Sequence, residues 1–75
     1  MKVMLFTTQF CAKCPGVKKK LEAAGIEVEE VNAIKYPQIV KEFGVKSVPT
    51  LVVTHPDSFE TFIGDGIGDY INGKN

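Results

Sequence analysis

An apolar run, a helical pattern and a second strand-like run follow one another at the start of this chain. Residues 2–7 are β-prone and almost continuously apolar, as expected of a central strand covered on both faces. From Pro15 to Ala24 the apolar side chains recur at helical spacing, and Gly25 suits the position after the helix. Residues 26–31 begin with apolar–acidic alternation, which predicts an edge strand with one exposed face. This order requires a right-handed crossover and a parallel pair of strands.

The rest of the chain predicts a second helix, a β-hairpin and a short last helix. Pro37 suits the first turn of a helix that we expect to reach about Phe43, and Gly44 suits its end. Residues 50–54 and 59–63 are β-prone and flank a Pro-containing turn at residues 55–58. Glycines from residue 64 onward open the last helix. We therefore expect an α/β fold with a four-stranded mixed sheet flanked by helices. Its order is strand, helix, strand, helix, strand, strand, helix, with the last two strands antiparallel.

The composition limits the size of the fold and the class of partner. A chain of 75 residues, 44% of them apolar, is expected to form a single domain over residues 1–75. Nine lysines balance nine acidic residues without any arginine, whereas proteins that bind nucleic acid normally carry a basic excess. No run approaches the ~18 apolar residues of a membrane span, and Met1–Phe6 carries no signal-type cleavage site. We expect a cytoplasmic monomer that contacts neither nucleic acid nor membrane.

Cys11 and Cys14 are the only cysteines, and they stand in C-x-x-C spacing directly after the first apolar run. A disulfide between them would close so short a loop that it removes little entropy from the unfolded chain. Such a bond is a poor structural crosslink. In a reducing cytosol the spacing favours either dithiol–disulfide exchange or the capture of a soft metal ion.

For exchange chemistry, one of the two thiols must ionise near neutral pH. Cys11 lies where the strand gives way to the helix, and the unsatisfied N–H groups and positive dipole of a helix start stabilise a thiolate. Cys11 is therefore the predicted nucleophile. Cys14, one turn further on, is the predicted resolving thiol, and Lys13 and Lys18 add a screened positive potential.

Pro15 leaves the start of this helix open. If Cys11 is the N-cap, Pro15 removes the first intrahelical hydrogen bond. If Cys14 is the N-cap, Pro15 is a well-suited first helical residue, but Cys11 moves away from the dipole. We favour a helix that is entered gradually over residues 11–15.

Several stretches together point to one known family. They are the C-x-x-C after the first strand, the helix and strand entry that follow it, a V-P-T before a later strand and the glycines after the last strand. In this chain they are Cys11-Ala12-Lys13-Cys14, Val17–Glu22, Gly25–Val28, Val48-Pro49-Thr50 and Gly64 onward. Over nearly its whole length the sequence resembles the thioredoxin-fold redoxins of the glutaredoxin/thioredoxin-like group.

The resemblance implies a thioredoxin-like fold and a thiol–disulfide oxidoreductase that reduces protein disulfides through a redox-active Cys11–Cys14 pair. In this family the proline before the third strand is cis and faces the cysteines. A cis Val48–Pro49 bond is therefore implied, and the Val48 backbone would hydrogen-bond an extended substrate segment. Gly64 is also implied in substrate binding. Phe10 either forms an apolar wall for a docking partner or packs back on the core.

The expected partners are a disulfide-containing protein and a source of electrons. Glutaredoxins that use glutathione have a tyrosine where Lys13 stands and a basic residue near Gln9, and Phe10 replaces the tryptophan of thioredoxins. Similar small redoxins are recharged by a thioredoxin-reductase-type flavoenzyme, which we expect here, with glutathione as the weaker alternative. Thioredoxins relay protons through a buried acid on the first strand. This chain has no such residue, since its first acid is Glu22. No cofactor is expected.

A soft-metal carrier is the alternative function. Copper and mercury carriers also place C-x-x-C on a loop after the first strand. Their order differs, since two strands lie between their helices, whereas a single strand is predicted between the first two helices here. Pro49 also has no role in such a carrier. Zinc requires four ligands, and only Cys11 and Cys14 are evident, so no metal site is predicted.

Overall fold

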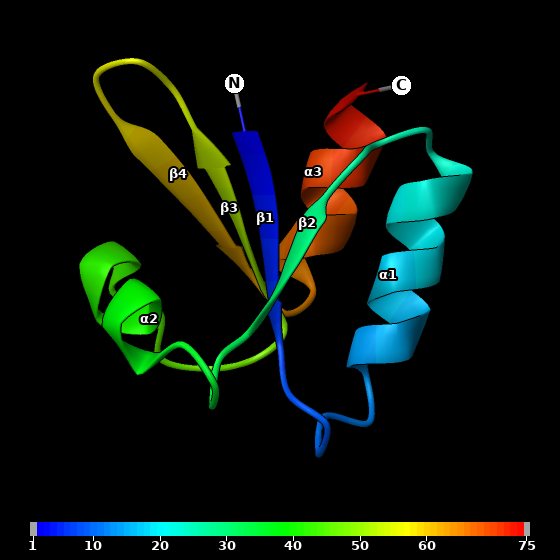
Figure 1. Cartoon of the computed structure of the whole chain (residues 1–75). Coiled ribbons are helices and arrows are strands. Elements are labelled where there is room, and N and C mark those ends of the chain that lie inside the picture. Colours follow the sequence, from blue (N-terminus) through cyan, green and yellow to red (C-terminus); the bar gives the residue numbers. More distant parts are fainter. Residues whose placement is uncertain (1, 75) are drawn as a thin grey trace.

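The computed structural model describes residues 2–74 and confirms the predicted α/β fold and the order of its elements (Figure 1). None of the helices within this part of the chain is long and apolar enough to cross a membrane. The elements are β1 (Lys2–Thr7), α1 (Cys14–Ala23), β2 (Glu29–Asn32), α2 (Pro37–Phe43), β3 (Thr50–Thr54), β4 (Phe59–Ile63) and α3 (Gly66–Lys74).

The four strands form one mixed sheet in the order β2-β1-β3-β4. β1 pairs with β2 in parallel and with β3 antiparallel, and β3 and β4 form an antiparallel hairpin. The predicted central position of β1 is confirmed, and its Leu5 and Phe6 are fully buried. The predicted edge position of β2 is confirmed as well.

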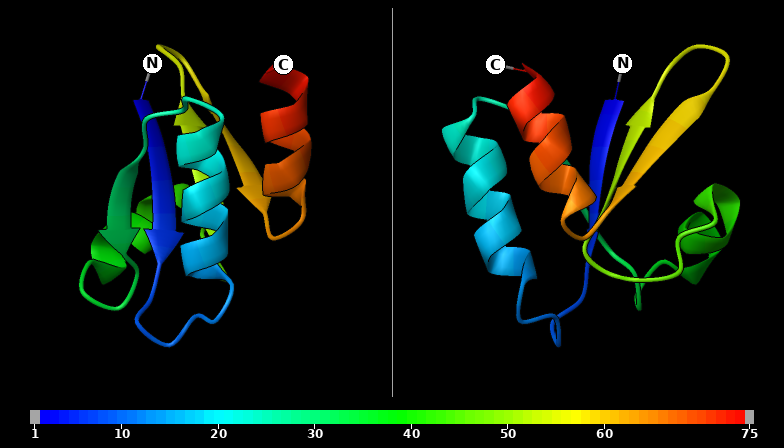
Figure 2. Two further views of the ribbon diagram at one scale, coloured as in Figure 1. Left: turned by 90° about the vertical axis from the view of Figure 1, so that its right-hand side faces the viewer. Right: turned by 180° about the vertical axis from the view of Figure 1, so that it is seen from behind.

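Helices cover both faces of the sheet, with α1 and α3 on one face and α2 on the other (Figure 2). Successive side chains of β1 point to opposite faces and so divide the core into two clusters. Leu5 packs with Leu21 of α1 and Ile67 of α3. Phe6 packs on the α2 side, where its ring meets the edge of Phe43 at a centroid distance of 6.3 Å. An apolar run without alternation therefore suits β1, because both of its faces are covered.

β2 begins at Glu29, so the predicted start at residue 26 was wrong. The amide of Ile26 donates instead to the carbonyl oxygen of Leu21 at 3.0 Å, which closes the end of α1 and takes this donor away from the sheet. Ile26 and Val28 still pack against the core cluster on the α1 side. The alternation of Ile26 and Val28 therefore reflects their burial on that face. Pairing of β2 with β1 starts only at Glu29, which lies opposite Met4.

Gly44 ends α2 in the left-handed backbone conformation, with φ of 65°, as its position in the sequence predicts. The next amide, that of Val45, donates to the carbonyl oxygen of Val40 at 3.0 Å and completes the helix end.

Gly44→Ala should lower the free energy of unfolding by about 1 kcal/mol, because a Cβ is disfavoured in this conformation. No atom lies within 4 Å of the added Cβ, so the loss would come from the backbone alone. Urea denaturation measures it. Gly68→Ala is the matched control, since Gly68 lies inside α3 with no positive φ, and alanine there should leave stability unchanged or raise it. Equal losses in both variants would contradict the conformational argument.

Candidate active site

The two cysteines are joined by a disulfide in the loop that leads from β1 into α1. Their Cα atoms are 5.5 Å apart. The loop is closed by Thr8, whose carbonyl oxygen accepts from the amide of Cys11 at 3.2 Å and whose hydroxyl accepts from the amide of Phe10 at 3.3 Å. Cys14 is 3% exposed, whereas Cys11 is only partly buried. The sulfur of Cys11 is thus the more accessible of the two.

The helix begins at Cys14 with Lys13 as its N-cap, so neither of the two predicted registers is correct. Pro15 is the second helical residue, and the first intrahelical hydrogen bond runs from the amide of Val17 to the carbonyl oxygen of Lys13 at 3.1 Å. The missing N–H of Pro15 therefore removes no intrahelical bond. The backbone of Cys11 lies before the helix, but its sulfur is bonded to Cys14 and so lies at the helix start.

The Val48–Pro49 bond is cis, as the family resemblance implies. Pro49 is buried, and the hydroxyl of Thr50 donates to the carbonyl oxygen of Ser47 at 2.6 Å across this turn. Val48 and Thr8 line the same hollow of about 220 Å³. Because Thr8 also lines the cavity at the cysteines, the cis-proline turn and the disulfide lie at the same end of the molecule.

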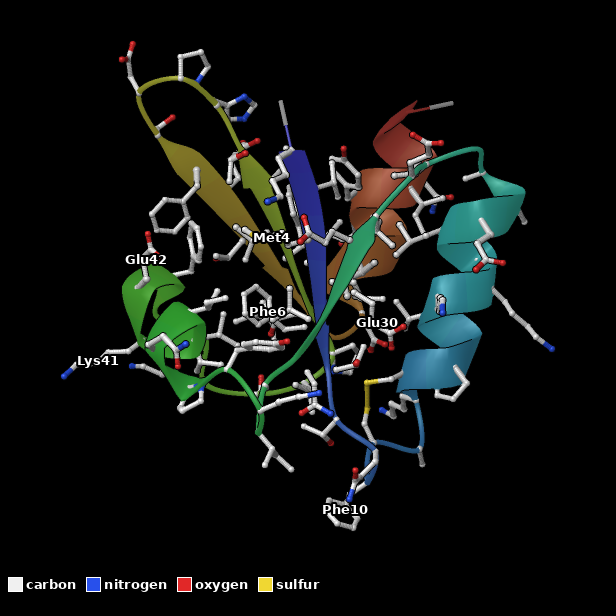
Figure 3. The ribbon with its side chains drawn as sticks, viewed as in Figure 1. Met4, Phe6, Phe10, Glu30, Lys41 and Glu42 are labelled. Carbon is white, nitrogen blue, oxygen red and sulfur yellow. A yellow bond between two sulfur atoms is a disulfide. The ribbon has the colours of Figure 1, made fainter. Side chains whose placement is uncertain are left out.

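Phe10 and Gly64 have different places around this site. Phe10 is 78% exposed and points away from the body of the protein beyond the disulfide (Figure 3), so it does not pack back on the core. Gly64 lies beside Pro49, to whose carbonyl oxygen its amide donates at 3.1 Å. The structure therefore brings Gly64 to the proline and leaves Phe10 as an exposed aromatic surface next to the cysteines.

A charged pair that the sequence did not reveal lies beside the disulfide. Glu30 of β2 accepts a hydrogen bond from the hydroxyl of Thr7 at 2.9 Å and pairs with the Lys18 ammonium of α1 at 3.0 Å. All three side chains line a cavity of about 290 Å³ together with both cysteines, its full lining being Thr7, Thr8, Gln9, Cys11, Cys14, Pro15, Lys18 and Glu30.

Hydrogen bonding and charge keep this pair ionised. The hydrogen bond from Lys18, followed by that from Thr7, holds the pKa of Glu30 below its ordinary value of 4.5. The same bond and the charge of Glu30 raise the pKa of Lys18 above its ordinary value of 10.5. The side chains of Lys18 and Glu30 are 45% and 44% exposed, so solvent and salt screen their attraction.

The position of Glu30 could have been found from the alternation in its own segment. Ile26 and Val28 face the α1 side of the sheet, and residue 30 follows them at strand spacing. Glu30 therefore stands in the phase of the buried residues, where an acid needs a partner. No acid lies on the first strand, and the acid that lines the cysteine cavity belongs to the neighbouring strand, where Glu30 pairs in register with Leu5.

Comparisons with known proteins agree with this geometry. The family model described as Glutaredoxin matches residues 3–55. A thioredoxin from Methanocaldococcus jannaschii is 36% identical over 59 residues, which cover 71% of this chain and 69% of that protein. The solved structure of NrdH-redoxin from Escherichia coli, a glutaredoxin-like protein, has a TM-score of 0.75 at 20% identity and covers 100% of this chain and 96% of that one. Thioredoxin 1 from Thermosipho africanus has a TM-score of 0.71 at 22% identity, covering 96% and 88%.

The metal-carrier alternative is not supported by these findings. A single strand, β2, lies between α1 and α2, and the hairpin follows both helices. The matching family model is Glutaredoxin, and the similar proteins named above are thioredoxins and a glutaredoxin-like redoxin. The cis bond at the buried Pro49 is the one that the family resemblance implies.

Proposed function

This chain belongs to the glutaredoxin family, and we propose that it reduces disulfide bonds in other proteins through the Cys11–Cys14 dithiol. Family membership and the C-x-x-C pair support thiol–disulfide redox chemistry in general. The observation that carries the finer proposal is the asymmetry of the pair. An accessible Cys11 is bonded to a buried Cys14 at the start of a helix, and the cis Val48–Pro49 turn lies at the same end of the molecule.

In the proposed reaction the reduced protein acts first through the Cys11 thiolate, which the helix start and Lys18 stabilise. It attacks one sulfur of the substrate disulfide. A mixed disulfide with Cys11 forms, and the other substrate sulfur leaves as a thiolate that takes up a proton. Cys14 then gives up its proton and attacks the sulfur of Cys11. The Cys11–Cys14 disulfide forms, the second substrate thiol is released, and two electrons have passed to the substrate.

A protein substrate suits the surroundings of the disulfide better than a small thiol alone. Phe10 supplies an exposed apolar surface beside Cys11, and the Val48 backbone adjoins a hollow that reaches Thr8. An extended segment that carries a disulfide could lie along Val48 in the manner of an added strand, with its sulfur at Cys11. The exposed ring of Phe10 would then contact the flanking residues of the substrate.

For the electron donor we propose a flavoenzyme of the thioredoxin-reductase type. NrdH-redoxin of E. coli, which is similar over the whole chain, is described as glutaredoxin-like with a thioredoxin-like activity profile. Lys13, which stands between the cysteines, also supports this choice over glutathione, because glutaredoxins that use glutathione carry a tyrosine there.

Insulin reduction with two separate electron sources tests both parts of the proposal. We expect turnover with thioredoxin reductase and NADPH, and little with glutathione, glutathione reductase and NADPH. Protein whose thiols have been alkylated after reduction is the control and should be inactive with either source. Turnover with glutathione alone would overturn the proposed donor. Absence of turnover with both, in protein that still forms the Cys11–Cys14 disulfide, would overturn the proposed reductase function.

A further inference from the structure

Two opposite charges face the cysteines inside one cavity. Lys18 follows Cys14 by one turn of α1, so the two side chains lie on the same face of that helix. Glu30 reaches the cavity from β2, and its carboxylate lies between the sheet and α1 near the disulfide (Figure 3). The carboxylate accepts from Lys18 through one oxygen and from Thr7 through the other.

These contacts fix Glu30 more firmly than an ordinary surface ion pair. Thr7 ends β1, from which the cysteine loop departs, and Lys18 belongs to the helix that Cys14 begins. One carboxylate therefore joins all three elements around the cavity. Its neighbour Glu29 offers a contrast on the same strand: it pairs with Lys2 at 2.8 Å, but neither residue lines the cysteine cavity.

The two charges act in opposite directions on a thiolate. An ammonium near the sulfur lowers the pKa of the thiol, and a carboxylate raises it. While Lys18 is held by Glu30, its ammonium is directed to the carboxylate and the two effects largely cancel at the sulfur. Removing either partner alone would leave the other charge uncompensated beside the cysteines.

We propose that Glu30 is a positioning residue: by holding Lys18 in an ion pair, it limits how far this ammonium stabilises the Cys11 thiolate. Glu30 thereby keeps the dithiol a stronger reductant than the helix start and Lys18 alone would make it, since stabilising the thiolate stabilises the reduced form. The inference rests on the proposed function, because it describes how the same cysteine pair is tuned.

A direct role for Glu30 as the base that deprotonates Cys14 fits less well. Its hydrogen bonds from Lys18 and Thr7 hold the pKa of the carboxyl below 4.5, and efficient proton transfer requires closer matching to a thiol near 8.5. Other charged or titratable groups also lie near the Lys18–Glu30 pair. Lys35 and Tyr36 share a second hollow with Glu30, and Lys13 stands between the cysteines. A third hollow is lined by Lys18 together with Lys2, Glu22, Glu27 and Glu29. All of them except Glu29, which the control variant changes, are the same in every variant proposed below.

Charge-neutralising variants of the reduced 75-residue chain separate the two effects. The pKa of the Cys11 thiol is measured from thiolate absorbance in the ultraviolet and from the pH dependence of alkylation. Glu30→Gln should lower this pKa by about 0.5, Lys18→Met should raise it by about 0.5, and the double variant should return close to the unmodified protein. Equilibration with glutathione redox buffers measures the equilibrium constant for oxidation of the dithiol to the disulfide. This constant should be about 3-fold smaller in Glu30→Gln than in the unmodified protein. Each difference should shrink between about 0.01 M and about 1 M salt.

Glu29→Gln is the matched control and should change neither quantity. Shifts of the same sign in both single variants, no shift in Glu30→Gln, or a double variant as displaced as the singles would each overturn the proposal. A shift caused by altered structure alone would persist at high salt and would also count against it. These titrations need no turnover, so they succeed or fail separately from the insulin assay.

Discussion

Cys11→Ser is expected to reduce insulin turnover to the uncatalysed background, a loss of roughly 10³-fold or more. Cys11 carries the accessible sulfur at the helix start, and a serine hydroxyl neither ionises near neutral pH nor forms a disulfide. The rate of NADPH consumption in the presence of thioredoxin reductase measures the effect.

Cys14→Ser should fail at a different step. The Cys11 thiolate can still attack, but the buried thiol that releases the substrate is missing. We expect a mixed disulfide between Cys11 and an insulin chain to accumulate, and mass spectrometry of the non-reduced sample should detect it. Urea denaturation compares the stability of both serine variants with that of the reduced unmodified protein. An adduct formed through Cys14 in Cys11→Ser, with neither adduct nor turnover in Cys14→Ser, would reverse the two roles.

The elements that the sequence predicts well are those whose pattern reflects burial directly. β1 is continuously apolar because helices cover both of its faces, and residues 50–54 repeat this as β3. Gly25 and Gly44 mark helix ends because both adopt a positive φ, at 75° and 65°. The cis bond before Pro49 followed only from the family resemblance, since nothing in the local residues distinguishes a cis from a trans proline.

The features that escaped prediction depend on contacts between elements. The start of α1 at Cys14 is set by how the loop folds back on Thr8, and propensity alone does not contain that information. The late start of β2 follows from the use of the Ile26 amide by α1. Glu30 was missed because its importance arises from Thr7 and Lys18, which approach it from two other elements.

Phe6→Ala should have the largest effect on the fold, with a loss of about 3–5 kcal/mol in the free energy of unfolding. Phe6 is fully buried and is in the same cluster as Met4, Val31 and Val52, and its ring contacts Phe43. A domain of 75 residues has a total stability of only about 4–11 kcal/mol. The loss is therefore a large share of the total stability, and the variant should unfold at a much lower urea concentration, as circular dichroism during a urea titration would show.

Phe59→Ala is the informative comparison, because Phe59 contacts the same partner ring. Its centroid lies 5.0 Å from that of Phe43, but its side chain lies on the edge strand β4 and Phe59 is 45% exposed. Removing a half-exposed ring leaves no enclosed cavity, so we expect a loss of about 1 kcal/mol. If the two variants lose equal stability, the aromatic contact with Phe43 matters more than burial in the central sheet. A large gap between them would place the main stabilisation of this fold at β1, the strand from which the cysteine loop departs.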